Sequence, residues 1–373
     1  KGVRKSFGDF VALHQLDLEI QEGEFLTLLG PSGCGKTTTL RLIAGFIEPM
    51  EGKILLGDED VTQVAPQHRE IGMVFQDYAL FPHMTIAENI GFGLKERRYP
   101  KQDINDRVEE LLDLIRLPEV HDRYPAEVSG GQPQRIAVAP AVAYPPKVLL
   151  MDEPLGALDL KLRETMQIEL RRIQQELAIT TVYVTHDQTE AMNMSDRIVV
   201  MNSGRIEQMG GAEDIYNEPR TRFVADFVGQ INLFDANSYE PETGMIKLDG
   251  LDQTVHVPVN LAGGGESLSL GVRPEDIGLA NSVESSSGMN HLAGVVSGRT
   301  FAGNLTRLFV DVGLQKPVIL EAKSQSVKSN VGDKVTLTWP VELSKLLKKP
   351  EHQHVELNIE GNPTFTEQSN GYP

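Results

Sequence analysis

Apolar residues recur with two different periods along the N-terminal part of the chain. Short apolar runs that end in polar residues predict buried strands at residues 25–29, 147–151 and 181–185. Longer segments with an apolar residue every three or four positions predict helices, one starting at a capping Asp103 and one over residues 158–177. Alternating strands and helices are typical of an α/β fold with a mostly parallel sheet. Ligands bind beyond the carboxyl ends of such strands, so we expect the chemistry there.

The pattern changes near residue 215, where Asn217-Glu218-Pro219 interrupts the helices and short alternating stretches follow. Val255, Val257 and Val259 alternate with polar residues, which is typical of strands in a β-rich barrel or sandwich. Runs of glycine and serine predict surface loops at 263–265 and 285–287. The predicted organisation is a first domain at 1–235 with a helical part at about 80–145, a β-rich domain at 236–350, and a flexible tail at 351–373.

A glycine-rich segment joins the first predicted strand to a helix. Residues 30–37 read Gly-Pro-Ser-Gly-Cys-Gly-Lys-Thr and fit the phosphate-loop pattern G-x-x-x-x-G-K-[ST] in its strand-to-helix context. The glycines let backbone N–H groups turn toward phosphates, and the helix N-terminus adds its dipole. The other interpretation is a plain glycine-rich turn. The predicted ATP-binding residues are Ser32, Gly33, Cys34, Gly35, Lys36, Thr37 and Thr38.

Two acids follow the predicted strand at 147–151. Asp152 and Glu153 fit a Walker B pair, in which the first acid supports Mg²⁺ and the second handles water. An Asp-Glu pair at a strand end is also common as a helix cap or a solvated turn. The phosphate loop upstream favours the catalytic interpretation, with Thr37 as a further Mg²⁺ ligand.

Composition and charge narrow the classes of function. The 373 residues include 53 acidic and 35 basic side chains, and the net charge of −18 disfavours a general nucleic-acid role. The single cysteine, Cys34, excludes a disulfide framework or a multi-cysteine metal cluster within one chain and suits a reducing compartment. Apolar runs are far shorter than the roughly 20 residues of a membrane helix, so any membrane role is expected to be peripheral.

The order of the motifs resembles that of ABC-transporter ATPases over most of the chain. Alone, a Ser-Gly-Gly-Gln run is an ordinary flexible loop and a single histidine an ordinary core or surface residue. The resemblance therefore rests on the succession of the phosphate loop, Gln76 in Val74-Phe75-Gln76, Val128-Ser129-Gly130-Gly131-Gln132, Asp152-Glu153, Leu158-Asp159 and His186. It implies a P-loop ATPase core with an inserted helical subdomain.

The resemblance also implies a role for individual residues. Phe7 matches the aromatic residue that stacks on adenine, although a plain core phenylalanine is the alternative. Gln76 would contact Mg²⁺ and the attacking water and would couple the site to membrane subunits. Glu153 would act as the general base, and His186 would hold the γ-phosphate. The metal set implied is Thr37, Gln76 and Asp152.

A second copy of the chain is implied as well. In the family two ATP molecules lie between the subunits of a head-to-tail dimer, and one subunit covers the ATP held by the other. The residues that would reach the opposite ATP are Arg123, Ser129, Gly130, Gly131, Gln132 and Asp159. Other implied partners are two membrane-spanning permease subunits and, indirectly, an extracytoplasmic solute-binding protein. The implied location is the cytoplasmic face of the inner membrane.

Further segments resemble importer ATPases with a C-terminal regulatory β-domain of the OB or TOBE type. They include Phe81-Pro82-His83-Met84-Thr85 and Val272-Arg273-Pro274-Glu275-Asp276. Among these importers, residues 230–234 (Gln-Ile-Asn-Leu-Phe) and the segment ending at Trp339 are most similar to spermidine/putrescine importers. Ferric-iron, sulfate and phosphonate importers are rivals, because this subunit does not touch the solute.

Two prolines depart from the family pattern. Pro133 falls in the first turn of the helix predicted after Ser129-Gly130-Gly131-Gln132, here called the signature motif and signature helix, where a missing N–H is tolerated. Pro140 stands in place of the family's usual arginine well inside that helix, where a proline costs about 3 kcal/mol and should kink the helix. Reduced activity or stability is the resulting hypothesis.

Two other classes of function compete with an importer ATPase. A soluble ABC-type ATPase acting on nucleic acid or ribosomes is disfavoured by the single cassette and the acidic excess. A regulatory module without catalysis is suggested only by Pro133 and Pro140. The presence of Lys36, Glu153 and His186 argues against it.

Overall fold

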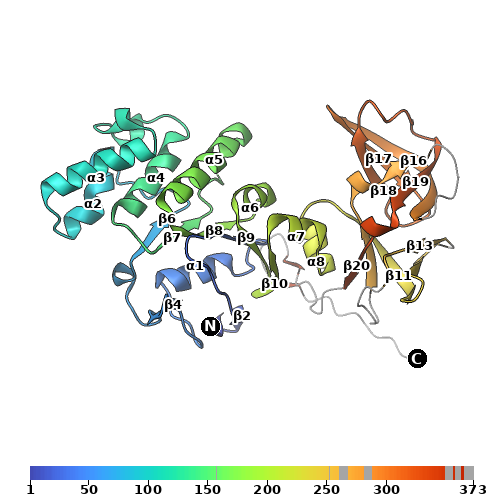
Figure 1. The fold of residues 1–373 in the computed structure, drawn as a ribbon, viewed down its shortest axis with the longest axis horizontal. Coiled ribbons are helices and arrows are strands. Elements are labelled where there is room, and N and C mark those ends of the chain that lie inside the picture. The colour runs from blue at the N-terminus through green and yellow to red at the C-terminus, as the bar shows by residue number, and fades with distance from the viewer. Residues whose placement is uncertain are drawn as a thin grey trace. The chain divides into compact units, whose positions relative to one another are not determined.

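The computed structural model describes residues 1–156, 158–251, 253–259, 268–280 and 288–348, and the backbone of 356–357 and 363–364. The chain forms two compact units, Lys1–Glu218 and Pro219–Pro373, here called the N-terminal and C-terminal units. Figure 1 shows their elements in chain order. The break expected at Asn217-Glu218-Pro219 coincides with this division. The finer domain limits, at 235 and 350 and for the helical part, stay predictions.

A six-stranded sheet forms the centre of the N-terminal unit, in the order β10-β9-β3-β8-β7-β6. Neighbouring strands from β9 to β6 pair in parallel, and β10 pairs with β9 in the antiparallel sense. The α/β class predicted from the sequence is therefore confirmed. The strands are β3 (Phe25–Leu29), β6 (Ile71–Val74), β7 (Val148–Asp152), β8 (Thr180–Thr185), β9 (Arg197–Asn202) and β10 (Arg205–Gly210).

The register of the central strands brings their carboxyl ends together. Leu29 of β3 pairs with Thr185 of β8, and Asp152 of β7 pairs with Val184 of β8. The β3 and β8 strands are buried at every position, because helices cover both faces of a parallel sheet. The segments that follow these strands therefore meet at one edge of the sheet.

Helices pack on this sheet through buried apolar side chains such as Leu40, Ile136 and Leu170. Thr85 begins α2 with a capping box that includes Glu88. The helices are α1 (Lys36–Ala44), α2 (Ile86–Glu96), α3 (Lys101–Leu114), α4 (Gln132–Ala143), α5 (Leu160–Leu177), α6 (Gln188–Met194) and α7 (Ala212–Asn217). Short 3₁₀ turns occur at Pro66–His68, Pro118–Val120 and Pro125–Glu127.

Two predicted helix starts differ from the structure. The prediction that Asp103 caps its helix is wrong, because α3 begins two residues earlier after Pro100 and Asp103 lies in the first turn. A proline with a fixed φ favours this earlier start, and an acid in the first turn still interacts well with the helix dipole. The long helix begins at Leu160 rather than at residue 158, because the Asp159 side chain accepts a hydrogen bond from the Leu162 N–H and forms the cap.

Two hairpins complete the N-terminal unit. Strand β1 (Val3–Phe7) pairs with β2 (Phe10–Leu16), and β4 (Leu55–Leu56) pairs with β5 (Glu59–Asp60). Leu13 and Leu16 bury the β1–β2 hairpin against the core that also contains Cys34. Among the described residues, no helix has the length and apolar character to cross a membrane.

The C-terminal unit consists mainly of two antiparallel sheets, as predicted for an OB or TOBE-type domain. Their orders are β13-β12-β11-β14-β20 and β15-β19-β16-β17-β18. Apolar residues of both sheets form one core around Trp339, which is fully buried. The elements are α8 (Arg222–Phe227), β11 (Asn232–Glu240), β12 (Met245–Leu248), β13 (Thr254–His256), β14 (Leu268–Val272), β15 (Gly278–Leu279), β16 (Met289–Ala302), β17 (Leu305–Asp311), β18 (Val318–Lys323), β19 (Lys334–Pro340) and β20 (Lys345–Lys348), with 3₁₀ turns at Pro274–Asp276 and Val341–Leu343.

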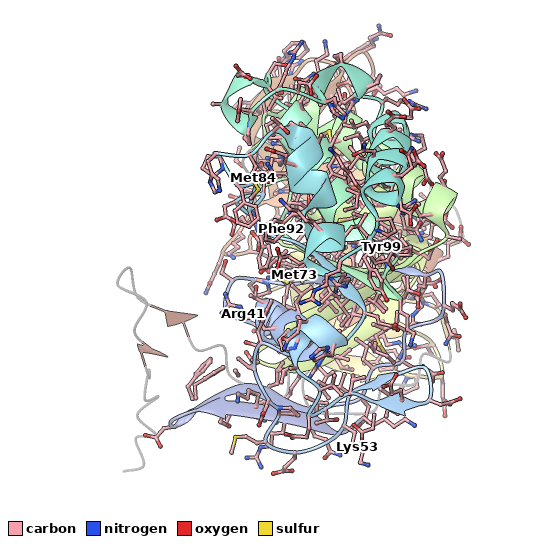
Figure 2. All side chains as sticks on the ribbon, turned by 90° about the vertical axis from the view of Figure 1, so that its left-hand side faces the viewer. Arg41, Lys53, Met73, Met84, Phe92 and Tyr99 are labelled. Carbon is pink, nitrogen blue, oxygen red and sulfur yellow. The ribbon has the colours of Figure 1, made fainter. Side chains whose placement is uncertain are left out.

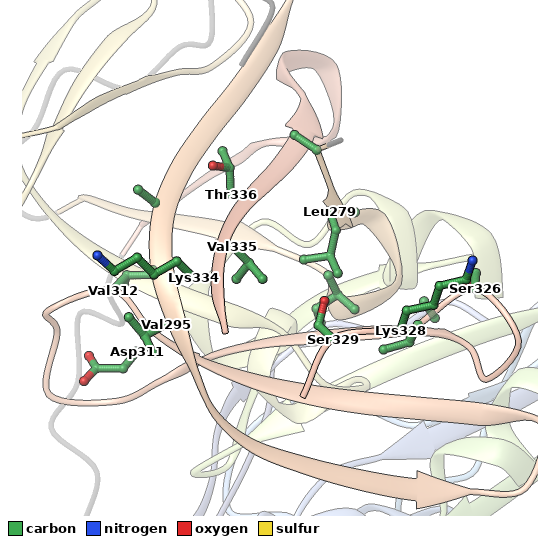
Figure 3. Close-up of a pocket in the computed structure, with 17 residues that line it drawn as sticks. Leu279, Val295, Asp311, Val312, Ser326, Lys328, Ser329, Lys334, Val335 and Thr336 are labelled. Atoms are coloured by element: carbon green, nitrogen blue, oxygen red, sulfur yellow. The ribbon is translucent and has the colours of Figure 1, made fainter. Parts of the chain in front are cut away.

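An open cavity of about 1130 Å³ lies in the C-terminal unit (Figure 3). Leu279 and Val335 line it together with the charged side chains of Asp311, Lys328 and Lys334. No residue of the ATPase motifs belongs to this lining.

Some sequence predictions fall outside the described residues. They are the loops at 263–265 and 285–287 and most of the tail at 351–373. Within that tail the structure describes β21 (Glu356–Leu357), which pairs with β22 (Pro363–Thr364).

Candidate ATP site

The phosphate loop lies between β3 and α1, as predicted. Gly35 has a φ of 106° and forms the N-cap of α1, while Gly33 has a φ of 80°. A Cβ atom on Gly35 would lie 2.6 Å from Leu13 Cδ2 and 2.8 Å from the Ala12 carbonyl oxygen. Gly35 therefore needs both left-handed backbone freedom and the absence of a side chain. The loop presents backbone N–H groups at a helix N-terminus, which favours an anion.

The Lys36 side chain is buried inside this loop. Its Nζ donates to the carbonyl oxygens of Gly30, at 2.6 Å, and of Pro31, at 3.0 Å, and lies 4.0 Å from Cys34 Sγ. An ammonium group carries three donors, and these contacts hold its positive charge at the loop. Burial raises the pKa of the Cys34 thiol, although the Lys36 charge opposes this shift. The thiol is therefore neutral at physiological pH.

Thr37 and Asp152 meet across 115 residues of sequence. Thr37 Oγ1 donates to Asp152 Oδ1 at 3.3 Å, which joins the start of α1 to the end of β7. Burial raises the pKa of the Asp152 carboxyl group, and the hydrogen bond from Thr37 works against that shift. The pair places a hydroxyl and a carboxyl oxygen next to the phosphate loop.

Glu153 and His186 form a second pair beside the first. Glu153 Oε2 lies 3.0 Å from His186 Nδ1, and the Glu153 N–H donates to the Val184 carbonyl at 3.0 Å. Glu153 has a φ of 45°, which is uncommon for a residue with a side chain and is often found at functional sites. The imidazole is largely exposed, with 57% of its side-chain surface accessible, so it can reach a ligand from solvent.

The loop around His186 contains charged residues that the sequence analysis did not single out. Asp187 caps α6 by accepting from the N–H groups of Thr189 and Glu190. Arg163 Nη1 donates to Asp187 Oδ2 at 2.8 Å. Asp187 followed three residues later by Glu190 is a sequence signal for a helix start, so the cap could have been predicted. The contact with Arg163 could not, because it depends on tertiary packing.

Gln76 lies two residues beyond the end of β6, whose Val74 pairs with Met151 of β7. The Gln76 side chain is exposed, and it stands at the same sheet edge as Asp152.

The segment that follows Gln76 is organised by Asn89, a buried residue of α2 that forms hydrogen bonds with Phe81, Met84 and Thr85. Met84 and Phe92 lie on the α2 side of the unit in Figure 2.

Phe7 ends β1 and is half exposed, so it is not a core residue. Its ring lies 5.3 Å from Lys5 Nζ. An exposed aromatic face of this kind can stack on a planar ligand. The alternative interpretation, a buried core phenylalanine, is therefore wrong.

The predicted signature residues form a separate group. Ser129 N and Oγ donate to Gln132 Oε1 at 2.9 and 3.0 Å, and Gly131 has a φ of 88° just before α4. Ser129 and Gly130 are exposed, as are Arg123 and Asp159. The side-chain hydrogen bonds of Ser129, Gln132 and Asp159 are made to residues outside the phosphate loop. The role of this group at the ATP of a second subunit stays a prediction.

Both unusual prolines lie in α4. Pro133 stands at the start of the helix, and Pro140 stands inside it, and the helix continues to Ala143. The predicted kink at Pro140 stays a prediction. Buried Ile136 and Val142 anchor the helix on both sides of Pro140.

A phosphate loop after the first central strand of a parallel sheet, with an acid pair at β7 and a histidine after β8, defines a nucleotide-binding cassette. A family model described as ABC transporter matches residues 13–156, and one described as TOBE domain matches residues 270–344. The chain is 47% identical over 350 residues to the spermidine/putrescine import ATP-binding protein PotA of Thermobifida fusca, covering 92% of this chain and 88% of that protein. The protein of the same name from Vibrio cholerae is 44% identical over 345 residues, with 91% of each chain covered.

Solved structures of ABC cassettes share the fold of the N-terminal part. The dimeric structure of a bacterial ABC transporter cassette has a TM-score of 0.51 and 33% identity, and the match covers 57% of this chain and 97% of that one. The cbiO1 protein of Clostridium perfringens, part of the ABC transporter complex cbiONQ, has a TM-score of 0.55 and 28% identity, with 58% and 89% covered. The chain belongs to the ATP-binding proteins of ABC transporters, with a TOBE domain, and it is an ATPase.

Proposed function

We propose that this chain is the ATP-hydrolysing subunit of a membrane transporter that imports a polyamine of the spermidine/putrescine type. The juxtaposition of the Thr37–Asp152 pair with the Glu153–His186 pair carries the catalytic half of the proposal. The relatives that match over nine tenths of the chain are named for spermidine/putrescine import, and these names support a polyamine as the solute.

Each catalytic residue has a position suited to its role. Lys36 and the N–H groups of residues 32–38 bind the phosphates. Glu153 takes a proton from the attacking water, and His186 contacts the γ-phosphate from its exposed position. Gln76 orients the water and the metal, and Phe7 stacks on the base. We infer that the Glu153–His186 contact, which occupies Glu153 Oε2, opens before hydrolysis.

The residues fit a phosphate-bound Mg²⁺. Mg²⁺ takes few protein ligands and completes its octahedron with phosphate oxygens and water, so a hydroxyl and one carboxylate suffice. Thr37 and Asp152 supply these two oxygens 3.3 Å apart. Among the described residues, no group of three or more His, Cys, Asp or Glu side chains is arranged to hold a metal ion. When bound, the ion would neutralise charge that develops on the phosphate oxygens.

A head-to-tail dimer completes the site. Ser129, Gly130, Gly131 and Gln132, at the N-terminus of α4, face the ATP held by the second subunit, and Arg123 and Asp159 assist them. The exposure of Ser129 and Gly130 supports this role. Closure of the dimer on ATP moves two permease subunits, which receive solute from an extracytoplasmic binding protein. The chain acts at the cytoplasmic face of the inner membrane.

Transport by the reassembled complex tests both halves of the proposal. The chain is coexpressed with its permease partners, reconstituted in vesicles, and supplied with the binding protein and labelled spermidine. We expect ATP-dependent spermidine uptake that competing putrescine reduces and Glu153→Gln abolishes. Uptake of ferric iron, sulfate or a phosphonate in place of spermidine would overturn the proposed identity of the solute and leave the ATPase role intact. Copurification of DNA or ribosomes in place of permeases would overturn the importer role itself.

A further inference from the structure

Arg163, in the first turn of α5, bonds to two segments that the proposed function assigns to different tasks. Its Nη2 donates to the Leu158 carbonyl at 3.0 Å, and its Nη1 donates to Asp187 Oδ2 at 2.8 Å. Leu158 precedes Asp159, which faces the second subunit, and Asp187 follows His186. One guanidinium group therefore bridges the dimer-facing segment and the γ-phosphate-facing loop.

A buried carboxylate stands opposite the same guanidinium group. Glu190 Oε2 accepts hydrogen bonds from Tyr183 and Thr185, both at 2.7 Å, so this side chain is held firmly. Its other oxygen, Oε1, lies 3.8 Å from Arg163 Nε. Burial raises the pKa of the Glu190 carboxyl group, and the nearby Arg163 charge only partly opposes this shift.

The Arg163 Nε–H is buried and has no hydrogen-bond partner in the described part of the chain. A buried donor without a partner costs free energy, so the arrangement favours any small shift that satisfies it. Moving from 3.8 Å to a hydrogen bond of about 3 Å requires less than 1 Å of displacement. A cavity of about 20 Å³, lined by Arg163, Glu190, Glu153 and His186 among others, gives the side chains room for that shift.

We propose that Arg163 is a positioning residue that couples dimer closure to His186. This inference rests on the proposed function. Contact of the second subunit with Asp159 displaces the Leu158 carbonyl, and Arg163 follows it and forms the Nε–Oε1 bond with Glu190. The same guanidinium group moves Asp187 and therefore His186. His186 then leaves Glu153, and both become available for the γ-phosphate and the attacking water.

A purely structural role is the alternative, in which Arg163 only fastens α5 to α6. The chain offers a matched control in Arg171, which lies on the same helix and has nearly the same side-chain exposure, 24% against 25%. Arg171 also pairs with an aspartate, Asp196, through a 3.0 Å hydrogen bond, but far along the helix from Asp159. Arg163→Gln and Arg171→Gln therefore remove similar ion pairs from the same helix.

The experiment measures ATP hydrolysis by the full purified chain over a range of ATP concentrations, together with the melting temperature of each variant. For Arg163→Gln we expect kcat per folded molecule to fall roughly 10- to 100-fold, because a misplacement of about 1 Å has effects of this size. We expect the ATP concentration at half-maximal rate to change less than about threefold and the Hill coefficient to approach 1. Arg171→Gln should keep both kcat and the Hill coefficient of the wild type.

Glu190→Gln provides a second variant if Arg163→Gln does not fold. Its amide oxygen can still accept hydrogen bonds from Tyr183 and Thr185. Its NH₂ group then faces Arg163, and as a donor it cannot attract the Arg163 Nε–H as a carboxylate oxygen does. We expect a lower kcat and Hill coefficient for Glu190→Gln, and a double variant no worse than Arg163→Gln alone. Wild-type kinetics in Glu190→Gln, or equal losses in Arg163→Gln and Arg171→Gln, would overturn the coupling role. Absence of hydrolysis by the wild-type chain would instead overturn the proposed function.

Discussion

His186 Nδ1 lies 3.0 Å from Glu153 Oε2, although the two residues are 33 positions apart in the sequence. Each follows a strand of the central sheet, and the parallel pairing of β7 with β8 brings the two strand ends together. The contact joins the proposed base to the proposed γ-phosphate ligand. The contact occupies Glu153 Oε2 and His186 Nδ1, and we propose that ATP binding rearranges this pair.

Replacing Glu153 by glutamine should stop hydrolysis without stopping ATP binding. The amide cannot take a proton from water, and loss of a general base lowers rates about 10²- to 10⁴-fold. We expect this loss in kcat, with ATP affinity close to that of the wild type, in phosphate-release and nucleotide-binding assays. Glu51→Gln, at an exposed glutamate paired with Arg4, is the control and should retain full activity. Normal hydrolysis by the Glu153 variant would exclude Glu153 as the base.

Replacing Pro140 by arginine should stabilise the N-terminal unit. Proline inside α4 removes one backbone hydrogen bond and crowds the preceding turn, at a cost of up to about 3 kcal/mol. We expect a higher melting temperature and equal or higher turnover for Pro140→Arg. Pro133→Arg is the matched control, since Pro133 stands in the first turn, where the N–H has no helical partner. If Pro140→Arg changes neither property, the hypothesis that this proline impairs the protein is rejected.

Removing the Asn89 side chain should destabilise the N-terminal unit by about 2 to 3 kcal/mol, because each lost hydrogen bond contributes about 1 kcal/mol and buried groups are left without partners. Asn89 accepts from the Phe81 N–H at 2.8 Å and donates to carbonyl oxygens of the same loop. Urea unfolding of Asn89→Ala, followed by circular dichroism, measures the change.

Two controls sharpen the Asn89 measurement. Asn193→Ala removes an exposed asparagine with one side-chain hydrogen bond, at 2.9 Å to Gln167, and should cost much less. The single tryptophan, Trp339, lies in the core of the C-terminal unit, so its fluorescence follows that unit. We expect the Trp339 transition to stay in place in Asn89→Ala. An equal loss for the two asparagine variants would contradict the loop-organising role of Asn89.

Asp196 should make stability depend on pH. Partial burial by itself would raise the pKa of Asp196, but hydrogen bonds from Arg171 and from the Phe25 N–H outweigh it and lower the pKa. An acid with a lowered folded pKa contributes stability above its unfolded pKa and loses it as the pH falls through the folded pKa. We therefore expect Asp196→Asn to cost about 1 kcal/mol at pH 7.

The pH profile of Asp196→Asn distinguishes this charge effect from lost packing. The difference in free energy of unfolding between wild type and variant should shrink once the pH falls below about 4. Urea unfolding at several pH values between 3 and 7 measures it. A difference that stays constant over that range would show that the charge of Asp196 contributes nothing.

Much of the fold and the identity of the candidate site residues could be predicted from local sequence. A buried strand, a glycine turn and a helix start are set by neighbouring residues, so the Gly30–Lys36 loop has the predicted context. The strand predicted at 147–151 lies one residue later at both ends, and the strand predicted at 181–185 begins one residue earlier. Asp103 was misjudged as a cap, because Pro100 and Asp103 both favour a helix start and local pattern does not rank them.

By itself, the sequence determined the strand–loop–helix units, the residue types at their ends, and which residues form the phosphate loop. The tertiary structure decided which of these ends touch. Strand order and register place Thr37 against Asp152 and Glu153 against His186, and packing of α5 brings Arg163 to Asp187. The physical reason is range: turn and helix geometry depend on residues a few positions away, whereas these contacts depend on how buried strands and helices stack.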